Sequence, residues 1–186
     1  FNLSLIKEIS SNLMNSGYVK EIKSSAYEFT EDQASIYIYA KPISKNSVNG
    51  LIGIQPSENG NIQFTGNVSL NFLNSLKYGE QLKIDWRRMF NASQNLITDI
   101  RLPFLFNSNF EINGVVNMIK KDSSFFNFEG QTTLNYLIKN HFSTGVLLAH
   151  NNSTNLLEDN YNSTSTNSFG FTFNYSLLNS LNNPSK

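Results

Sequence analysis

The sequence predicts a mainly β chain, a partial antiparallel transmembrane β-barrel preceded by a small α+β segment. After Pro42, apolar and polar residues alternate with a period of two through run after run. Several runs reach about ten residues, which is the length that a tilted strand needs to cross a bilayer. Asn, Gln, Ser and Thr dominate the polar positions of these runs. In a soluble sheet, by contrast, the face exposed to solvent usually carries Lys and Glu. A hydrated lumen accounts for this chemistry.

Composition excludes several other classes. The 15 Phe, 8 Tyr and 1 Trp argue against a disordered chain. Fourteen basic and fourteen acidic residues balance, so no nucleic-acid partner is expected. Without cysteine there is no disulfide framework and no thiolate metal site. No apolar run is long enough for a transmembrane helix, and a chain starting at Phe1 is expected to be mature or a fragment.

The first elements form the small α+β segment. Leu5, Ile6, Ile9 and Leu13 have helical spacing, which predicts an amphipathic helix from Ser4 to about Asn15. Two β-prone runs follow, Tyr18 to Phe29 and Ala34 to Ala40, and are expected to pair as a hairpin beside the helix.

The remaining chain predicts about eight strands. Alternation is complete from Ile62 to Phe72, where the apolar members are every second residue. The other expected strands cover Val48–Gln55, Leu82–Arg87, Leu96–Leu102, Phe110–Met118, Phe126–Tyr136, His141–His150 and Phe169–Ser176. A soluble sandwich would alternate in the same way, so periodicity alone leaves both architectures open.

The connections predict how the barrel is oriented. Ser57–Gly60 and the neighbourhood of Lys121 and Asp122 are expected to be tight turns on one side of the membrane, and Asn151–Asn167 a long polar loop on the other side, facing outside the cell. Aromatic residues near strand ends suggest interfacial girdles, although β-strands favour aromatic residues anyway. These residues are Phe72, Tyr78, Phe104, Phe106, Phe110, Phe125 and Phe142.

Three sequence segments resemble a known family. The run Val48-Asn49-Gly50-Leu51-Ile52-Gly53 resembles the entry into the first barrel strand of Omp85 outer-membrane proteins. Gly66-Asn67-Val68-Ser69-Leu70-Asn71, followed by Leu76, Tyr78-Gly79-Glu80-Gln81-Leu82 and Asp85-Trp86-Arg87-Arg88, looks like the family's second and third strands. Leu102-Pro103-Phe104-Leu105-Phe106 resembles the end of the next one. The version here is similar to BamA- or TamA-like members from the Bacteroidetes.

The resemblance implies two domains. Residues 1–44 would be the C-terminal part of a periplasmic POTRA domain, and residues 45–186 the N-terminal strands of the barrel. About eight strands are roughly half of the family's sixteen, so either further chain completes the barrel or the eight strands close on themselves. The family's lumenal Arg-Gly-Phe is absent, and Asn182–Lys186 reads as a polar loop.

The candidate functional residues belong to one barrel strand and to the barrel lumen. The resemblance makes Val48–Gln55 the lateral-gate strand, with candidates Val48, Gly50, Leu51, Ile52, Gly53 and Ile54. Gly50 and Gly53 would weaken its pairing, or merely relieve crowding. Candidate lumenal charges, expected to pair across strands, are Lys83, Asp85, Arg87, Asp99, Arg101 and Glu111.

No catalytic residue, metal ligand or cofactor is expected. His141 and His150 lie near opposite ends of one expected strand, too far apart for one metal ion. Asp85 and Glu129 lie on different strands with no sign of convergence.

The function implied by the resemblance is insertion or translocation of other outer-membrane proteins. The first barrel strand would template an incoming strand of an unfolded client, and the periplasmic segment would capture clients or accessory proteins. The bilayer of the bacterial outer membrane is the expected environment, with the N-terminal segment in the periplasm. The alternatives are a passive outer-membrane channel or structural barrel, and a soluble β-rich binding module.

Overall fold

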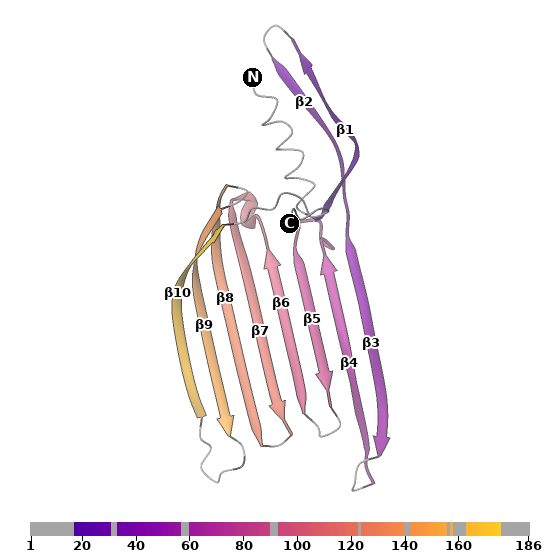
Figure 1. Ribbon diagram of the computed structural model, residues 1–186, viewed down its shortest axis with the longest axis vertical. Coiled ribbons are helices and arrows are strands. Elements are labelled where there is room, and N and C mark those ends of the chain that lie inside the picture. The colour runs from indigo at the N-terminus through magenta and orange to yellow at the C-terminus, as the bar shows by residue number, and fades with distance from the viewer. Residues whose placement is uncertain are drawn as a thin grey trace, which may run out of the picture.

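The computed structural model describes residues 17–30, 33–56, 60–89, 93–122, 124–139, 142–155, 157 and 163–175. These residues form a two-stranded hairpin and one eight-stranded antiparallel sheet (Figure 1). The helix expected from Ser4 to Asn15, His141 and the polar loop Asn182–Lys186 lie outside the described residues.

The hairpin prediction is confirmed. Strands β1 (Val19–Phe29) and β2 (Ala34–Pro42) pair antiparallel, with Val19 opposite Pro42 and Phe29 opposite Ala34. The turn between them begins at Thr30, whose N–H donates to the carbonyl of Gln33 at 2.9 Å. At the other end, the N–H of Ile43 donates to the carbonyl of Tyr18 at 2.8 Å, which closes the base of the hairpin.

The sheet is a meander in which each strand pairs with its neighbour in sequence. Its strands are β3 (Lys45–Pro56), β4 (Ile62–Leu73), β5 (Gln81–Arg88), β6 (Gln94–Leu102), β7 (Phe110–Lys121), β8 (Phe125–Lys139), β9 (Phe142–Asn155) and β10 (Ser163–Tyr175). A 3₁₀ turn, η1 (Leu105–Asn107), lies between β6 and β7. Every strand predicted from alternation is present. Strand lengths run from 8 to 15 residues, so every strand is longer than the five or six residues typical of soluble sheets.

The described strands do not close into a barrel. β3 and β10 lie at opposite edges of the sheet, and each pairs on one side only among the described residues (Figure 1). The idea that eight strands close on themselves is therefore wrong for the described chain.

The predicted loop pattern is also wrong. β9 continues to Asn155 and β10 begins at Ser163, so most of the expected loop Asn151–Asn167 is paired strand. The β3–β4, β7–β8 and β9–β10 connections all lie at the same end, which we call the far end (Figure 1). The expected short turns therefore do not lie opposite the expected long loop. The β4–β5 and β6–β7 connections, residues 74–80 and 103–109, lie at the end that carries β1 and β2, which we call the hairpin end.

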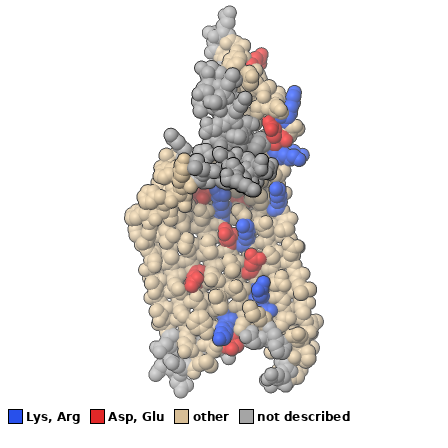
Figure 2. Space-filling model, viewed as in Figure 1, with Lys and Arg blue, Asp and Glu red and all other residues tan. Residues whose placement is uncertain are grey.

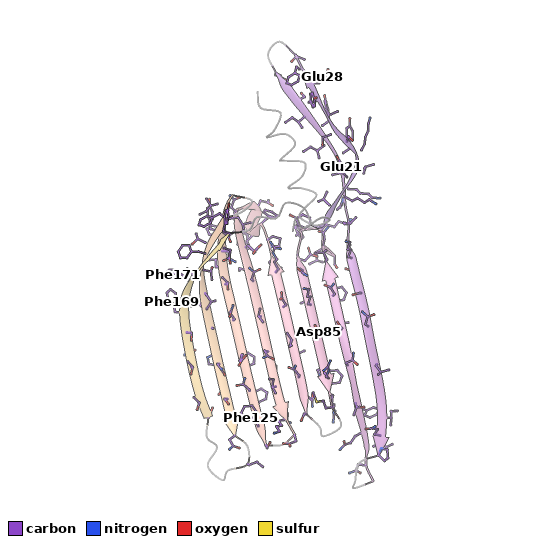
Figure 3. All side chains as sticks on the ribbon, in the orientation of Figure 1. Glu21, Glu28, Asp85, Phe125, Phe169 and Phe171 are labelled. Carbon is purple, nitrogen blue, oxygen red and sulfur yellow. The ribbon has the colours of Figure 1, made fainter. Side chains whose placement is uncertain are left out.

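The aromatic residues do not form two girdles of equal size. Phe125 starts β8 at the far end (Figure 3). The other six expected girdle residues lie at or next to the hairpin end, because they flank the β4–β5, β6–β7 and β8–β9 connections. They are Phe72, Tyr78, Phe104, Phe106, Phe110 and Phe142.

Candidate functional site

The strand register divides the sheet into an apolar and a polar face. Residues directly opposite each other on neighbouring strands point to the same face, so rows can be followed from β3 to β10. One such row contains Val48, Leu70, Ile84, Thr98, Val116, Gly130, His150 and Asn167. Residues two positions along each strand complete the apolar face, and the residues between them form the polar face.

The apolar residues form a belt that climbs obliquely across the rows. On β3 the belt covers Val48 to Ile54, and on β10 it covers Phe169 to Tyr175. On β3 the belt ends on the hairpin side at Val48, and the residue of β10 in the same row is Asn167. On β10 the belt ends on the hairpin side at Tyr175, eight residues beyond Asn167. The hairpin-side limit of the belt therefore shifts by eight residues over the seven steps from β3 to β10. With about 3.3 Å per residue and 4.8 Å between strands, this slope corresponds to a strand tilt of about 38°. Barrel strands in membranes are tilted by roughly 35–45°.

The apolar belt has no cover among the described residues. Phe169, Phe171 and Phe173 are 64%, 70% and 72% exposed, and Figure 3 shows the first two projecting from β10. The chain exposes 13660 Å², whereas a compact monomer of 21.0 kDa exposes roughly 9,000 Å². No second sheet packs against the belt in the described part of the chain, so the sandwich expected of a soluble module is not formed there.

The polar face carries all six predicted lumenal charges on β5, β6 and β7, and Figure 2 shows the side where charged residues gather over these strands. Lys83 and Asp99 are direct register partners, but the ion pair within 4.0 Å among the described residues joins Arg101 and Glu111, at 2.8 Å. Asn113 donates a hydrogen bond to the other carboxylate oxygen of Glu111 at 2.9 Å. The Glu111 side chain is 7% exposed and that of Arg101 51%.

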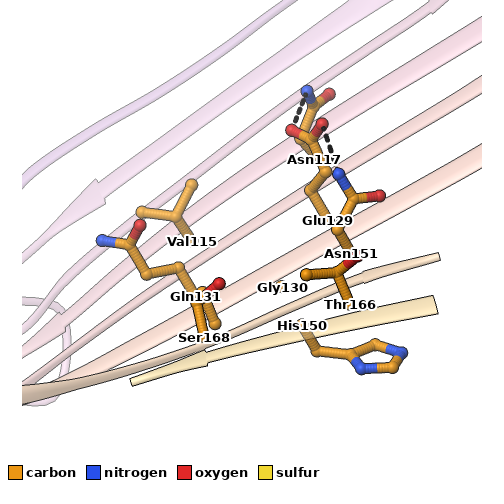
Figure 4. Close-up of a pocket in the computed structure, with 10 residues that line it drawn as sticks. Val115, Asn117, Glu129, Gly130, Gln131, His150, Asn151, Thr166 and Ser168 are labelled. Atoms are coloured by element: carbon orange, nitrogen blue, oxygen red, sulfur yellow. Dashed lines mark hydrogen bonds between the residues drawn. The ribbon is translucent and has the colours of Figure 1, made fainter. Parts of the chain in front are cut away.

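Glu129 is the centre of a second polar cluster. The side-chain amides of Asn117, Asn127 and Asn151 donate to its carboxylate at 3.3, 3.1 and 3.5 Å. This cluster borders a hollow on the polar side of β7 to β10 (Figure 4). Asp85 does not join it, because β6 and β7 separate β5 from β8. Sequence reasoning missed the amide partners, although Asn127 and Asn113 stand two residues from their glutamates, on the same face.

Gly145 allows the polar face to curl. A Cβ at this position would meet the carbonyl of Leu134 and the side chain of Asn135. With that space free, the hydroxyl of Thr172 on β10 reaches across β9 and donates to Oδ1 of Asn135 on β8 at 3.0 Å. A bond that skips a strand requires the polar face to be concave here, as the inside of a barrel is.

The predicted gate residues Val48, Gly50, Leu51, Ile52, Gly53 and Ile54 all lie on the edge strand β3. Gly50, on the apolar face, leaves room beside the carbonyl of Asn67, 3.3 Å from an added Cβ. Gly53, on the polar face, would place a Cβ 2.9 Å from Oγ1 of Thr65. Relief of crowding therefore supplies a local reason for Gly53.

The β4–β5 turn fastens the hairpin base to the sheet. Asn74 donates from Nδ2 to the carbonyls of Ile43 at 2.9 Å and Tyr18 at 3.3 Å, and its Oδ1 accepts from the N–H of Gly79 at 3.0 Å. Gly79 has φ +79, and its missing Cβ leaves room for the Tyr18 ring, 3.1 Å from where that atom would be. The sequence had not singled out Asn74 for this role.

Glu80 completes this turn from inside. Burial raises the pKa of its carboxyl group, but backbone N–H groups of Leu76, Tyr78 and nearby residues donate to the carboxylate and lower the pKa by more. Two of these bonds are 2.5 and 3.1 Å long. The net result is a pKa below the ordinary value, so the buried turn contains a carboxylate at neutral pH.

The described residues contain no group of three or more His, Cys, Asp or Glu that could hold a metal ion. No helix in that part of the chain is long and apolar enough to span a membrane. His150 lies inside β9, which continues to Asn155, so its expected place near a strand end is wrong.

Comparison with known proteins supports the fold. No family model matches the sequence, and no curated protein matches it. Among solved structures, the chain is similar to BamA from Haemophilus ducreyi lacking POTRA domains 1–3, with a TM-score of 0.57 and 15% identity. The match covers 95% of this chain and 38% of that one. The described strands thus share their fold with this BamA structure, whereas membership of the Omp85 family, the Bacteroidetes type and the POTRA segment stay predictions.

Proposed function

We propose that this chain is the N-terminal part of an outer-membrane β-barrel that helps other outer-membrane proteins to insert. The observation that carries the membrane assignment is the uncovered apolar belt, whose slope matches the tilt of barrel strands. The likeness to BamA supports the choice of this kind of barrel. The polar concave face, with its amide-held carboxylates, would then line a hydrated lumen.

The mechanism requires no covalent chemistry. β3 presents one unpaired edge among the described residues, and an unpaired edge offers a row of N–H and C=O groups to an incoming strand. A client strand that pairs with β3 satisfies its backbone before it leaves water, which removes the main cost of placing an extended chain in lipid. The side-chain pattern of β3 favours a client strand that is apolar on one face.

The hairpin is proposed to lie in the periplasm and to contribute to client or accessory-protein capture. One of its faces groups Tyr27, Phe29, Ile36 and Ile38, which are 52%, 53%, 39% and 37% exposed. An isolated hairpin is marginal in water, so a contact on this face would stabilise the partner and the hairpin together.

Single-cysteine cross-linking tests the proposal, because the chain has no cysteine of its own. Leu51→Cys on β3 is expected to form a disulfide with a cysteine placed in the terminal strand of an outer-membrane client during its assembly. Asn95→Cys on β6, a central strand, lies in the same row and on the same face as Leu51; it is the matched control and should not cross-link. Equal or absent cross-linking at the two positions would overturn the templating role.

Membrane location is tested separately. Heat-dependent gel migration of the protein extracted from outer-membrane fractions is expected, since barrels resist unfolding in detergent without boiling. Recovery from the aqueous fraction would overturn the membrane assignment. Outer-membrane location with normal client assembly after depletion, together with ion conductance in planar bilayers, would favour the passive channel.

A further inference from the structure

The charges of the sheet are segregated by face. On the described strands, every acidic side chain of the eight-stranded sheet lies on the polar face, namely Asp85, Asp99, Glu111 and Glu129. The apolar face carries two formally charged side chains in the same described region, Arg88 and Lys120, and both are basic. A charge on a lipid-facing surface is costly unless it lies near the membrane boundary or has a partner.

Both cations occupy one row at the far-end limit of the belt. Arg88, Gln94 and Lys120 are register partners on β5, β6 and β7. The adjacent row toward the hairpin is apolar and contains Trp86, Leu96 and Met118. The two basic residues are separated by two strand spacings, roughly 10 Å, a distance that their long side chains can close.

This row has donors without acceptors. Nε of Arg88 is buried and has no hydrogen-bond partner, and neither basic residue forms an ion pair within 4.0 Å with a described residue. A guanidinium binds phosphate oxygens through paired N–H groups, an ammonium adds a second charge, and the Gln94 amide supplies another donor. An anion with several oxygens would satisfy all three groups.

From this arrangement we propose that Arg88, Gln94 and Lys120 bind the phosphate of an anionic lipid headgroup in the leaflet opposite the β1–β2 hairpin. The proposal rests on the membrane assignment above. Its occupant follows from position, because the row borders the belt that lipid chains would cover, and from charge, because the apolar face offers no described carboxylate to neutralise the cations. Trp86 would lie against the same lipid.

Trp86 is the sole tryptophan of the chain and lies two residues from Arg88 on the same face, so it reports on this site. The whole protein that contains this chain, with any tryptophan outside the chain replaced by phenylalanine, is reconstituted in phosphatidylcholine liposomes that contain brominated phosphatidylcholine or brominated phosphatidylglycerol, and quenching of Trp86 is measured. We expect the anionic lipid to be enriched at Trp86 by roughly five-fold per basic residue at low salt, and this preference to fall as salt is added.

Charge-matched variants locate the effect. The double variant Arg88→Gln/Lys120→Gln is expected to quench equally with both lipids. Lys83→Gln/Arg87→Gln removes the same charge from the polar face and should keep the wild-type preference. Equal quenching by both lipids in the unaltered chain, or an equal loss of preference in the two double variants, would overturn the lipid site and leave the membrane assignment intact. Quenching by neither lipid would overturn both.

Discussion

Replacing Asn74 by alanine is expected to loosen the junction between the hairpin and the sheet. Asn74 is 1% exposed and has the left-handed φ of 55°. Its side chain supplies a partner to the N–H of Gly79 and to the carbonyls of Ile43 and Tyr18. In the variant the carbonyl of Tyr18 keeps the N–H of Ile43, so two backbone groups lose the partner that Asn74 provides.

The size of the effect follows from these contacts. Each buried backbone group without a partner costs about 1–3 kcal/mol, and alanine in the left-handed conformation adds about 1–2 kcal/mol. The free energy of unfolding should therefore fall by about 3 kcal/mol or more. Asn74→Gly accepts the conformation and should recover about 1 kcal/mol of that loss.

Urea titration in detergent micelles measures the stability, and amide hydrogen exchange at Gly79 measures the local effect. Ser75→Ala is the matched control, because Ser75 is exposed and its hydroxyl bonds the exposed Asn46 side chain; its cost should stay within about 0.5 kcal/mol. The reasoning is refuted if Asn74→Ala matches this control and the Gly79 amide exchanges at the wild-type rate.

Three further predictions follow from the structure. Because the pKa of Glu80 is lowered in the folded chain, its carboxylate stabilises the turn at pH values above the ordinary carboxyl pKa, and this contribution should be lost as pH falls through the folded-state pKa. Glu80→Gln should therefore flatten the acid limb of a plot of unfolding free energy against pH. An unchanged acid limb in the variant would contradict this prediction. Gly145→Ala should lower the free energy of unfolding in urea titrations by about 1–3 kcal/mol, because the added Cβ overlaps β8. Gly114→Ala is the control, since a Cβ there would have nothing within 4 Å, and it should be neutral or slightly stabilising. Similar costs for the two variants would argue against a curled polar face. A double-mutant cycle on Arg101→Gln and Glu111→Gln should give a coupling of about 1 kcal/mol, held down by the exposure of Arg101, and additive effects would show that the ion pair contributes nothing.

The alternation pattern predicted the strands well because period two is a local property of the chain. From Ile62 to Phe72 each apolar residue is followed by a polar or small one, and only a strand places such residues on opposite faces. Placing Lys83, Asp85 and Arg87 on one face required no tertiary information for the same reason.

The prediction of a long loop from Asn151 to Asn167 also rested on a local pattern, a run of polar residues, and it was wrong. Residues such as Thr154 and Ser163 look like loop residues, yet they are register partners on β9 and β10. Beyond the apolar belt, polar side chains on both faces carry no penalty, and the backbone hydrogen bonds of the ladder are the same whatever the side chains are. The polar residues of β9 and β10 near Thr154 and Ser163 therefore show where the apolar belt ends, and the two strands continue beyond that limit.

Strands with one apolar and one polar face follow from the order of the residues alone, because alternation acts between neighbouring residues. Tertiary structure alone decided which residues meet across strands. Register placed Arg88, Gln94 and Lys120 in one row, and folding brought Asn74 to the carbonyl of Tyr18, 56 residues away. Such contacts depend on how separate strands align and where turns close, and no pattern within a single strand encodes that alignment.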